Sequence, residues 1–365
     1  MYLNNLSLIN FKNIDDAKFD FSNRVNCFLG NNGQGKTNIL DAIHHLSYTK
    51  SYFNSIDSQN IKFEKPFYVI QGEVSQDDDV FSLYCGLKKG EKKIFKKNKK
   101  NYSRLADHIG LFPVVMITPY DINLVLDGSE TRRKFIDALI SQFNKNYLNE
   151  LIQYNKLIQQ RNSILKGMKG SSSINDLLDI YEIQIIQKSK IIFERRNSFI
   201  KEFSPIFDKY YNDISDGKEE VELIYSSSLH EHSMEELLRM NYDKDRMLTY
   251  TSAGVHRDDL QFMISGFPIK KFGSQGQQKT FLIALKLAKF EYITLKKGFK
   301  PILLLDDIFD KLDNDRVGYI LKLIEKNDVG QTFITDTDLE KVPNILKDFN
   351  VDFNKFVIDK GEVKI

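Results

Sequence analysis

The chain has 365 residues, with 52 lysines and arginines against 50 aspartates and glutamates, which gives a formal net charge of +2. Apolar residues make up 41% and charged residues 28%, as in an ordinary globular protein, and the length allows two or three domains. A net charge this small excludes a basic surface over the whole protein, so any contact with nucleic acid must be local.

Neither the cysteines nor the N-terminus indicates an exported protein. Cys27 and Cys85 lie in apolar, strand-like segments and fit neither a metal cluster nor a disulfide framework. The first residues carry Asn4, Asn5 and Asn10 among apolar ones and lack a basic-then-apolar leader. No apolar run has the length of a membrane-spanning helix. We therefore expect a cytoplasmic protein without membrane contact.

Residues 2–29 carry the pattern of three short strands, and the third leads into the clearest motif of the chain. Residues 30–37 fit G-x-x-x-x-G-K-[ST], and helical spacing of apolar residues follows them. Strand, glycine loop and helix together let backbone N–H groups converge on phosphate oxygens. In this setting Lys36 bridges the β- and γ-phosphates and the Thr37 hydroxyl binds Mg²⁺. A bare glycine turn is the alternative, and the agreement of both flanks disfavours it. The predicted nucleotide-binding residues are Gly30, Asn31, Asn32, Gly33, Gln34, Gly35, Lys36, Thr37 and Asn38.

An antiparallel strand pair is predicted at 67–70 and 80–84, and a lysine-dense segment follows it. Its lysines either protect a hairpin edge from pairing with other strands or contact a nucleic-acid backbone. The segment alone favours the first interpretation. These lysines are Lys88, Lys89, Lys92, Lys93, Lys96, Lys97, Lys99 and Lys100.

The middle of the chain changes to a helical period. Apolar residues recur every three or four positions from about Thr131 to Leu165, and again from Leu178 to Tyr210. The glycine- and serine-rich residues 167–173 separate the two runs, so the helices must form an antiparallel hairpin. We predict a helical arm, residues 129–245, inserted into an α/β lobe made of residues 1–128 and 246–365.

Two further segments complete the predicted site. The apolar strand 301–305 ends in Asp306, which would hold Mg²⁺ directly or through water, and Asp307, which would polarise the attacking water. Residues 273–277, with Ser274 and Gly276, open a helix whose start can bind an anion. The alternatives are a loop cap for the acids and a simple helix cap for the serine. Because the phosphate loop already encloses one nucleotide, this second helix start is best explained as capping the γ-phosphate of ATP held by another copy.

These motifs resemble the ABC-type heads of the SMC class, and more specifically the RecF family of recombination-repair and gap-repair ATPases. The carrying segments span nearly the whole chain in the order of that family, and the helical hairpin matches its short arm. Besides the nucleotide motifs, they are residues 10–13, 117–121, 132–137, 249–251, 254–260 and 309–313.

The resemblance implies an ABC-type P-loop ATPase head with mixed sheets and an inserted helical arm. It implies a weak, DNA-dependent ATPase that dimerises with ATP on double-stranded DNA at single-strand/double-strand junctions. It also implies partnership with RecR and RecO in loading RecA. By matching positions, Ser274, Gly276 and Gln277 act across the dimer, and Asp313 faces the partner's nucleotide. Lys36, Asp306 and Asp307 serve catalysis.

Several positions depart from the family pattern or keep alternatives open. Asp307 stands where such heads commonly have glutamate, which suits slow hydrolysis, and no histidine lies near residues 335–337. Asp121 is the candidate for the Q-loop position and for a further metal ligand. His256-Arg257 either braces the junction of the lobes or has chemistry that the sequence does not assign. A small-molecule kinase would leave residues 273–277 without a purpose, and a transporter-type ATPase subunit would need a membrane-facing stretch.

Overall fold

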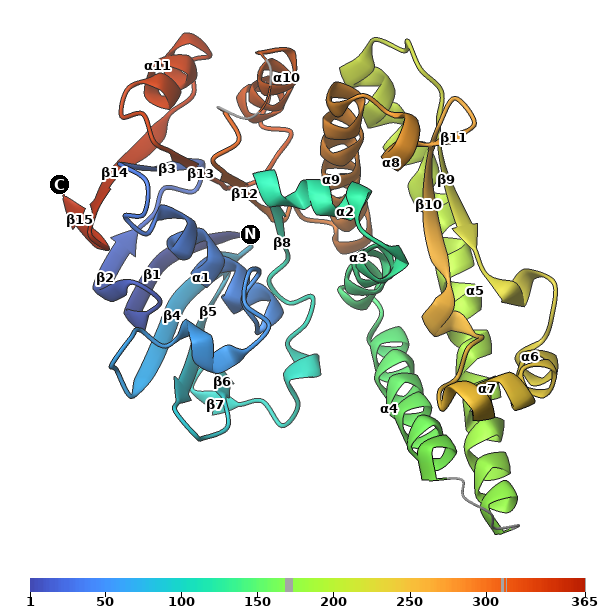
Figure 1. The fold of residues 1–365 in the computed structure, drawn as a ribbon. Coiled ribbons are helices and arrows are strands. Elements are labelled where there is room, and N and C mark those ends of the chain that lie inside the picture. The colour runs from blue at the N-terminus through green and yellow to red at the C-terminus, as the bar shows by residue number, and fades with distance from the viewer. Residues whose placement is uncertain (168–172, 310–311, 313, 365) are drawn as a thin grey trace. The chain divides into compact units, whose positions relative to one another are not determined.

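The computed structural model describes residues 1–167, 173–309, 312 and 314–364 (Figure 1). The chain divides into two compact units, the first made of Met1–Asp121 with Ile283–Ile365 and the second of Ile122–Leu282. These limits differ from the predicted lobes, because residues 122–128 and 246–282 belong with the second unit. The interpretation of residues 129–245 as an inserted arm stays a prediction.

The first unit contains two six-stranded sheets. One is antiparallel, in the order β2 (Ile14–Asp20), β1 (Tyr2–Phe11), β4 (Phe67–Gln76), β5 (Asp79–Lys88), β6 (Ile94–Lys97) and β7 (Lys100–Asn101). The other is parallel except for its last strand, in the order β8 (Val114–Ile117), β12 (Ile302–Asp306), β13 (Thr332–Asp336), β3 (Val25–Leu29), β14 (Phe353–Asp359) and β15 (Glu362–Lys364). The mixed α/β architecture confirms the predicted fold class, and the three N-terminal strands lie where the sequence predicts them.

Helix α1 (Lys36–Tyr48) packs against both sheets of the first unit: β1, β4 and β5 of one, and β8, β12 and β13 of the other. The central strands β3, β12 and β13 are buried at every position, as expected for parallel strands covered on both faces. Two further helices, α10 (Asn314–Glu325) and α11 (Lys341–Asp348), follow β12 and β13 in the chain. One continuous hydrophobic core therefore fixes the edge at which β3 and β12 end.

The second unit is mainly helical. Its helices are α2 (Asn123–Leu126), α3 (Ser129–Ser141), α4 (Lys145–Gly167), α5 (Ser173–Ser215), α6 (Met234–Met240), α7 (Tyr242–Leu248) and α8 (Ile269–Phe272). Helices α4 and α5 pack on each other, which confirms the predicted helical hairpin. The first predicted helical run is two helices rather than one, because the side chain of Asn144 accepts the N–H of Tyr147 at 2.9 Å and so caps α4. The residues 168–172 of the predicted turn lie outside the described part.

A three-stranded antiparallel sheet lies beside α5, with β10 (Asp259–Ile264) between β9 (Val221–Ser226) and β11 (Phe267–Pro268). The predicted strand at 259–264 is confirmed at both ends. Helix α9 (Gln275–Lys297) begins in the second unit and continues in the first from Ile283. Among the described residues, no helix is long and apolar enough to cross a membrane.

Two fully buried arginines hold the second unit together. Arg196 of α5 forms ion pairs of 3.0 Å with Asp137 of α3 and with Asp258, and it donates to the carbonyl of Val255 at 2.7 Å. A buried charge is tolerated only when it is paired and hydrogen-bonded, and Arg196 meets both conditions. Because its partners come from α3 and from the segment before β10, this one side chain joins three parts of the unit.

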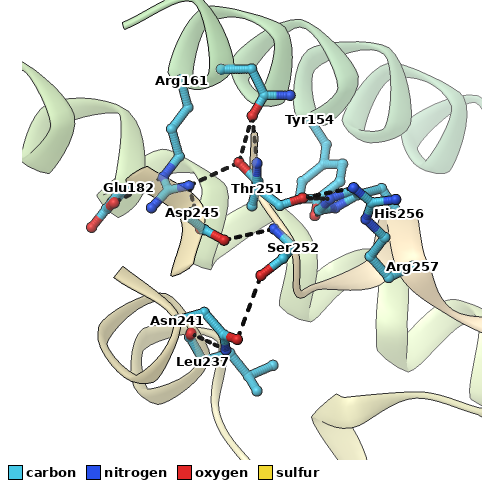
Figure 2. Close-up of polar contacts among 11 residues, drawn as sticks. Tyr154, Arg161, Glu182, Leu237, Asn241, Asp245, Thr251, Ser252, His256 and Arg257 are labelled. Carbon is cyan, nitrogen blue, oxygen red and sulfur yellow. Dashed lines mark hydrogen bonds and ion pairs between the residues drawn. The ribbon is translucent and has the colours of Figure 1, made fainter. Parts of the chain in front are cut away.

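Figure 2 shows the second network, around Arg161. Arg161 pairs with Glu182 at 2.9 Å and Asp245 at 2.7 Å, and it donates to the Thr251 hydroxyl at 2.9 Å. The Thr251 carbonyl accepts from the Nε2 of His256 at 3.0 Å. Because a carbonyl can only accept, Nε2 carries the proton and Nδ1 accepts from the hydroxyl of Tyr154 at 2.8 Å. Both ring nitrogens of His256 are thus used inside the second unit, which supports a bracing role for this residue within that unit.

Burial of histidines makes the stability of the fold sensitive to acid. Desolvation lowers the pKa of four histidines from its ordinary value near 6.5: to about 3 for His45, to about 4 for His108 and His256, and well below it for His44. Between pH 6.5 and 4 the unfolded chain binds protons at these positions while the folded chain does not. Their stabilising contribution is therefore complete above pH 6.5 and is lost as the pH falls toward 4.

We predict that the free energy of unfolding, measured by urea titration, falls steadily as the pH is lowered from 7 to 5. Each buried histidine contributes up to about 1.4 kcal/mol per pH unit in this range. His256→Gln should reduce the slope of the free energy of unfolding against pH by up to about 1.4 kcal/mol per pH unit, which corresponds to one proton. A stability that stays constant over this range would show that these imidazoles titrate in the fold as they do in the unfolded chain.

Candidate functional site

Residues 30–35 form the loop between β3 and α1, and Lys36 and Thr37 are the first two residues of α1, so strand, glycine loop and helix follow each other as the sequence predicts. Two of its glycines are required by sterics: Gly35 has φ +111°, and a Cβ there would lie 2.9 Å from the Oδ1 of Asn13. A Cβ at Gly30 would lie only 2.4 Å from the carbonyl oxygen of Ile358. Gly35 is also the N-cap of α1, and no side chain forms a capping hydrogen bond at this helix start. Such a helix start can bind a phosphate.

Lys36 is buried and folds back over the loop. Its Nζ donates to the carbonyl of Gly30 at 2.5 Å and to that of Asn31 at 2.8 Å. Burial lowers the pKa of Lys36, while the nearby carboxylates of Asp307, Asp336 and Asp306 raise it. An ammonium held by two neutral carbonyls can exchange them for phosphate oxygens, which give stronger, charge-assisted hydrogen bonds.

Thr37 and Asp306 meet at the carboxyl edge of the parallel sheet. The Thr37 hydroxyl donates to Oδ1 of Asp306 at 2.8 Å, and the hydroxyl of Thr335 at the end of β13 donates to the same oxygen at 2.8 Å. Desolvation raises the pKa of Asp306, and the two hydroxyls and Lys36 oppose that shift. The result is a buried group of hard oxygen atoms beside the phosphate loop, the ligand type that Mg²⁺ requires. These residues fit a magnesium–nucleotide site.

Asp307 has a strained backbone. Its φ is +49°, which is uncommon for a residue with a side chain, and its N–H donates to the Thr335 hydroxyl at 2.9 Å. Its Oδ1 is buried and accepts no hydrogen bond from any described residue. Burial removes this oxygen's hydrogen bonds to water, and no described donor replaces them. The oxygen is therefore well suited to accept a hydrogen bond from a bound water or ligand.

The segment predicted to act across a dimer forms a capping box at the start of α9. The N–H of Ser274 donates to Oε1 of Gln277 at 2.6 Å, and the Gln277 N–H donates to the Ser274 hydroxyl at 3.2 Å. Gln277 also donates to Glu219 at 2.6 Å. The simple cap is therefore present, and Ser274 at this helix start is exposed. Asp313, predicted to face a partner's nucleotide, lies outside the described residues.

Asp121 is enclosed by the fold. One of its oxygens pairs with Lys286 of α9 at 2.8 Å and accepts the hydroxyl of Tyr52, and the other accepts the N–H of Thr118 at 2.7 Å. Lys286 also donates to the carbonyl of Met116 at 2.9 Å, and burial lowers its pKa while Asp121 raises it. Since both carboxylate oxygens have partners, the contacts favour a structural role for Asp121 over the predicted metal role.

The lysine-dense segment divides into two groups. The side chain of Lys93 is only 8% exposed and binds both oxygens of Asp57 at 2.7 Å, so it belongs to the fold rather than to a contact surface. Lys96 and Lys97 instead lie over the rings of Tyr84 and Phe81, with Nζ 5.2 Å and 4.5 Å from the ring centroids. An open groove of about 470 Å³ lies on the face of the antiparallel sheet that carries Tyr84 and Lys96, and it also includes Lys99. Lys97 follows Lys96 in β6 and therefore points to the other face.

Comparison with known proteins first defines the class. Residues 2–355 match the family described as the RecF/RecN/SMC N-terminal domain. A crystal structure of the Smc head domain from Pyrococcus furiosus, with an extended coiled coil and bound to the C-terminal domain of ScpA, shares the fold with a TM-score of 0.55 at 17% identity over the whole chain. The fold is that of the ATPase heads of the SMC class.

The chain belongs to the RecF family within that class. The DNA replication and repair protein RecF of Flavobacterium johnsoniae is 52% identical over 348 residues, 95% of this chain and 97% of that protein. The protein of the same name from Bacteroides thetaiotaomicron is 45% identical over 364 residues and covers this chain completely. A structure described as the recombination mediator protein RecF-ATPrS in the RecFOR pathway matches all of this chain and 97% of that one, with a TM-score of 0.89 and 33% identity.

The pairing of Lys286 with Asp121 makes a stability prediction. Lys286→Met should cost about 3–5 kcal/mol, because it leaves a buried carboxylate without its partner. Adding Asp121→Asn should recover much of that loss, because the amide can still accept the N–H of Thr118. A double-mutant cycle measured by urea unfolding checks this. Additive losses in the double variant would show that the two side chains do not depend on each other.

Proposed function

We propose that this chain is an ATP-driven DNA-binding switch of recombinational repair and replication-gap repair. The hydrogen bond between Thr37 and Asp306 is the observation that carries the proposal, because it joins the phosphate loop to the metal-binding acid. Membership of the RecF family and full-length similarity to proteins named for DNA replication and repair support the same function.

Each residue of the site then has a defined task. When bound, Mg²⁺–ATP supplies the negatively charged triphosphate and the bond to its γ-phosphoryl group, which water hydrolyses. Thr37 and Asp306 would hold the metal through their oxygens, and Lys36 would exchange the loop carbonyls for oxygens of the β- and γ-phosphates. Asp307 orients water with its free buried oxygen. Its carboxylate is one methylene shorter than the glutamate common in such heads, so we propose slow hydrolysis, stimulated by DNA.

The exposed start of α9 serves a second copy of the chain. Ser274, Gly276 and Gln277 bind the γ-phosphate of ATP held by the partner, and the family resemblance assigns Asp313 to the same nucleotide. ATP thereby holds two chains together, and hydrolysis releases them. The dimer binds double-stranded DNA near single-strand/double-strand junctions by its form, because phosphate contacts carry no sequence information. RecR and RecO are the proposed protein partners, and loading of RecA on gapped DNA is the outcome.

Sedimentation velocity with four additions tests this function: no ligand, Mg²⁺–ATP, duplex DNA, and both together. We expect monomers without ATP, dimers with ATP, and a larger complex with ATP and duplex. Single-stranded DNA alone should not replace the duplex. A chain that stays monomeric with saturating ATP and duplex would contradict the proposal.

Ser274→Arg should leave ATP binding by the monomer unchanged and abolish ATP-dependent dimerisation, because the large cation fills the exposed helix start. A matched control is Ser233→Arg, which removes the serine of a second capping box at the start of α6 in the same unit. The control should dimerise with ATP as the unchanged protein does. Equal dimerisation of both variants would remove the start of α9 from the interface.

Glutamate in place of Lys96 and Lys99, which line the groove, should weaken duplex binding. The slope of the logarithm of the binding constant against the logarithm of salt concentration should become shallower by roughly 0.9 for each DNA phosphate that these lysines no longer neutralise. Glutamate in place of the exposed Lys322 of α10 and the exposed Lys326 just after that helix makes a charge control. Fluorescence anisotropy at several salt concentrations measures both. If the two sets change the salt slope equally, the lysines of the sheet face only protect the edge.

A further inference from the structure

Two turns that are distant in sequence hold the phosphate loop from outside. One is the turn between β1 and β2, where Asn13 donates its Nδ2 to the carbonyl of Gly33 at 3.3 Å. The other is the turn between β14 and β15. There the N–H of Gly361 donates to the carbonyl of Gln34 at 2.9 Å, and the N–H of Lys360 donates to the side-chain Oε1 of Gln34. All of these residues belong to the first compact unit.

These contacts determine where the loop amides point. In a planar trans peptide the carbonyl of one residue and the N–H of the next point in opposite directions. With the Gly33 carbonyl held by Asn13, the N–H of Gln34 must point away from that turn. With the Gln34 carbonyl held by Gly361, the N–H of Gly35 must point away from the C-terminal hairpin. The two amides are therefore oriented before any phosphate arrives.

The C-terminal turn has the right backbone for this contact. Lys360 and Gly361 are the two residues between paired Asp359 and Glu362, with φ of +51° and +82°, as in a type I′ hairpin turn. The hairpin ladder does not use the N–H groups of these central residues, so both can donate to Gln34. A Cβ on Gly361 would lie 3.2 Å from the carbonyl oxygen of Asn13, which shows how closely the two turns meet.

The turn between β1 and β2 is itself fixed. The Oδ1 of Asn13 accepts from Asn38 of α1 at 2.7 Å, and its carbonyl accepts from Lys62 at 3.1 Å. The Asn13 side chain also occupies the space that a Cβ on Gly35 would need. The side-chain amide of Asn13 therefore has a partner at each end. It cannot turn away from Gly33 without also breaking the hydrogen bond from Asn38.

We propose that Asn13 and the turn Lys360–Gly361 are positioning residues for the nucleotide: they hold the carbonyls of Gly33 and Gln34 so that the following amides converge on the triphosphate. The inference rests on the proposed ATP binding. It makes the last strands of the chain part of nucleotide recognition, although they contribute no side chain to the loop. Because the amides act on phosphates, the effect applies to any triphosphate, with or without a base.

Asn13→Ala and Gly361→Ala test the proposal, with Gly90→Ala as the matched control. Gly90 lies in the same unit with φ +81°, and a Cβ there meets no atom within 4 Å, so the control has the same backbone strain without the contact. The probes are Mg²⁺–ATP and inorganic tripolyphosphate, each competing with a fluorescent ATP analogue. The ¹H–¹⁵N signal of the Gly35 amide is recorded without nucleotide.

We expect each test variant to bind both probes about tenfold more weakly. This is the effect expected when one loop amide no longer points at the phosphates and its charge-assisted hydrogen bond is lost. The Gly35 amide signal should shift in both, and the control should bind as the unchanged protein does. Loss of ATP affinity with unchanged tripolyphosphate affinity would overturn the proposal, as would affinities within about twofold of the control. If the unchanged protein binds neither probe, the proposed ATP function fails as well.

Discussion

A hydrogen bond of 2.8 Å between Thr37 and Asp306 joins residues that are 269 positions apart, and the whole nucleotide site depends on it. It exists because β3 and β12 flank β13 as parallel strands, so that their carboxyl ends lie at one edge of the sheet. A slip of β12 by one residue would turn Asp306 to the other face of the sheet. The burial of these strands on both faces fixes that register, and the core thereby determines the chemistry.

Local patterns were enough to predict much of this protein. The phosphate loop, the acids after the apolar strand and the strand Asp259–Ile264 depend on short-range periodicity and turn chemistry, and the structure has them where predicted. Contacts between distant segments could not be predicted in that way. Gln331 bridges the backbone of Leu3 and Ser22 with three hydrogen bonds, and nothing in its neighbours in sequence marks it. The same holds for the ion pair of Lys93 with Asp57, because no periodic pattern in the sequence relates these two residues.

In the second unit, the helical period of the apolar residues predicts helices but does not predict how they are held together. Its polar core consists of Arg161 and Arg196 with carboxylates from several elements, and periodicity cannot pair such residues. Removing one partner would leave an uncompensated buried charge, so the networks favour one arrangement of helices and strands. Ser274 directly precedes helix α9 in this unit, and Lys286 lies further along the same helix in the other unit. The segment proposed to contact a second copy is therefore covalently continuous with the buried Asp121 network.

In the proposed function, one chain cannot complete its own ATP site, because the start of α9 from a second copy is needed. The most direct measurement mixes two inactive variants: Lys36→Ala lacks the phosphate-binding amine, and Ser274→Arg lacks an open helix start. In a mixed dimer, the second variant supplies the phosphate loop and the first supplies the helix start, so one complete site forms. We predict that neither variant hydrolyses ATP alone and that the equimolar mixture does, at up to about half the rate of the unchanged protein for each mixed dimer. Full hydrolysis by Ser274→Arg alone, or a silent mixture of two folded variants, would contradict the account.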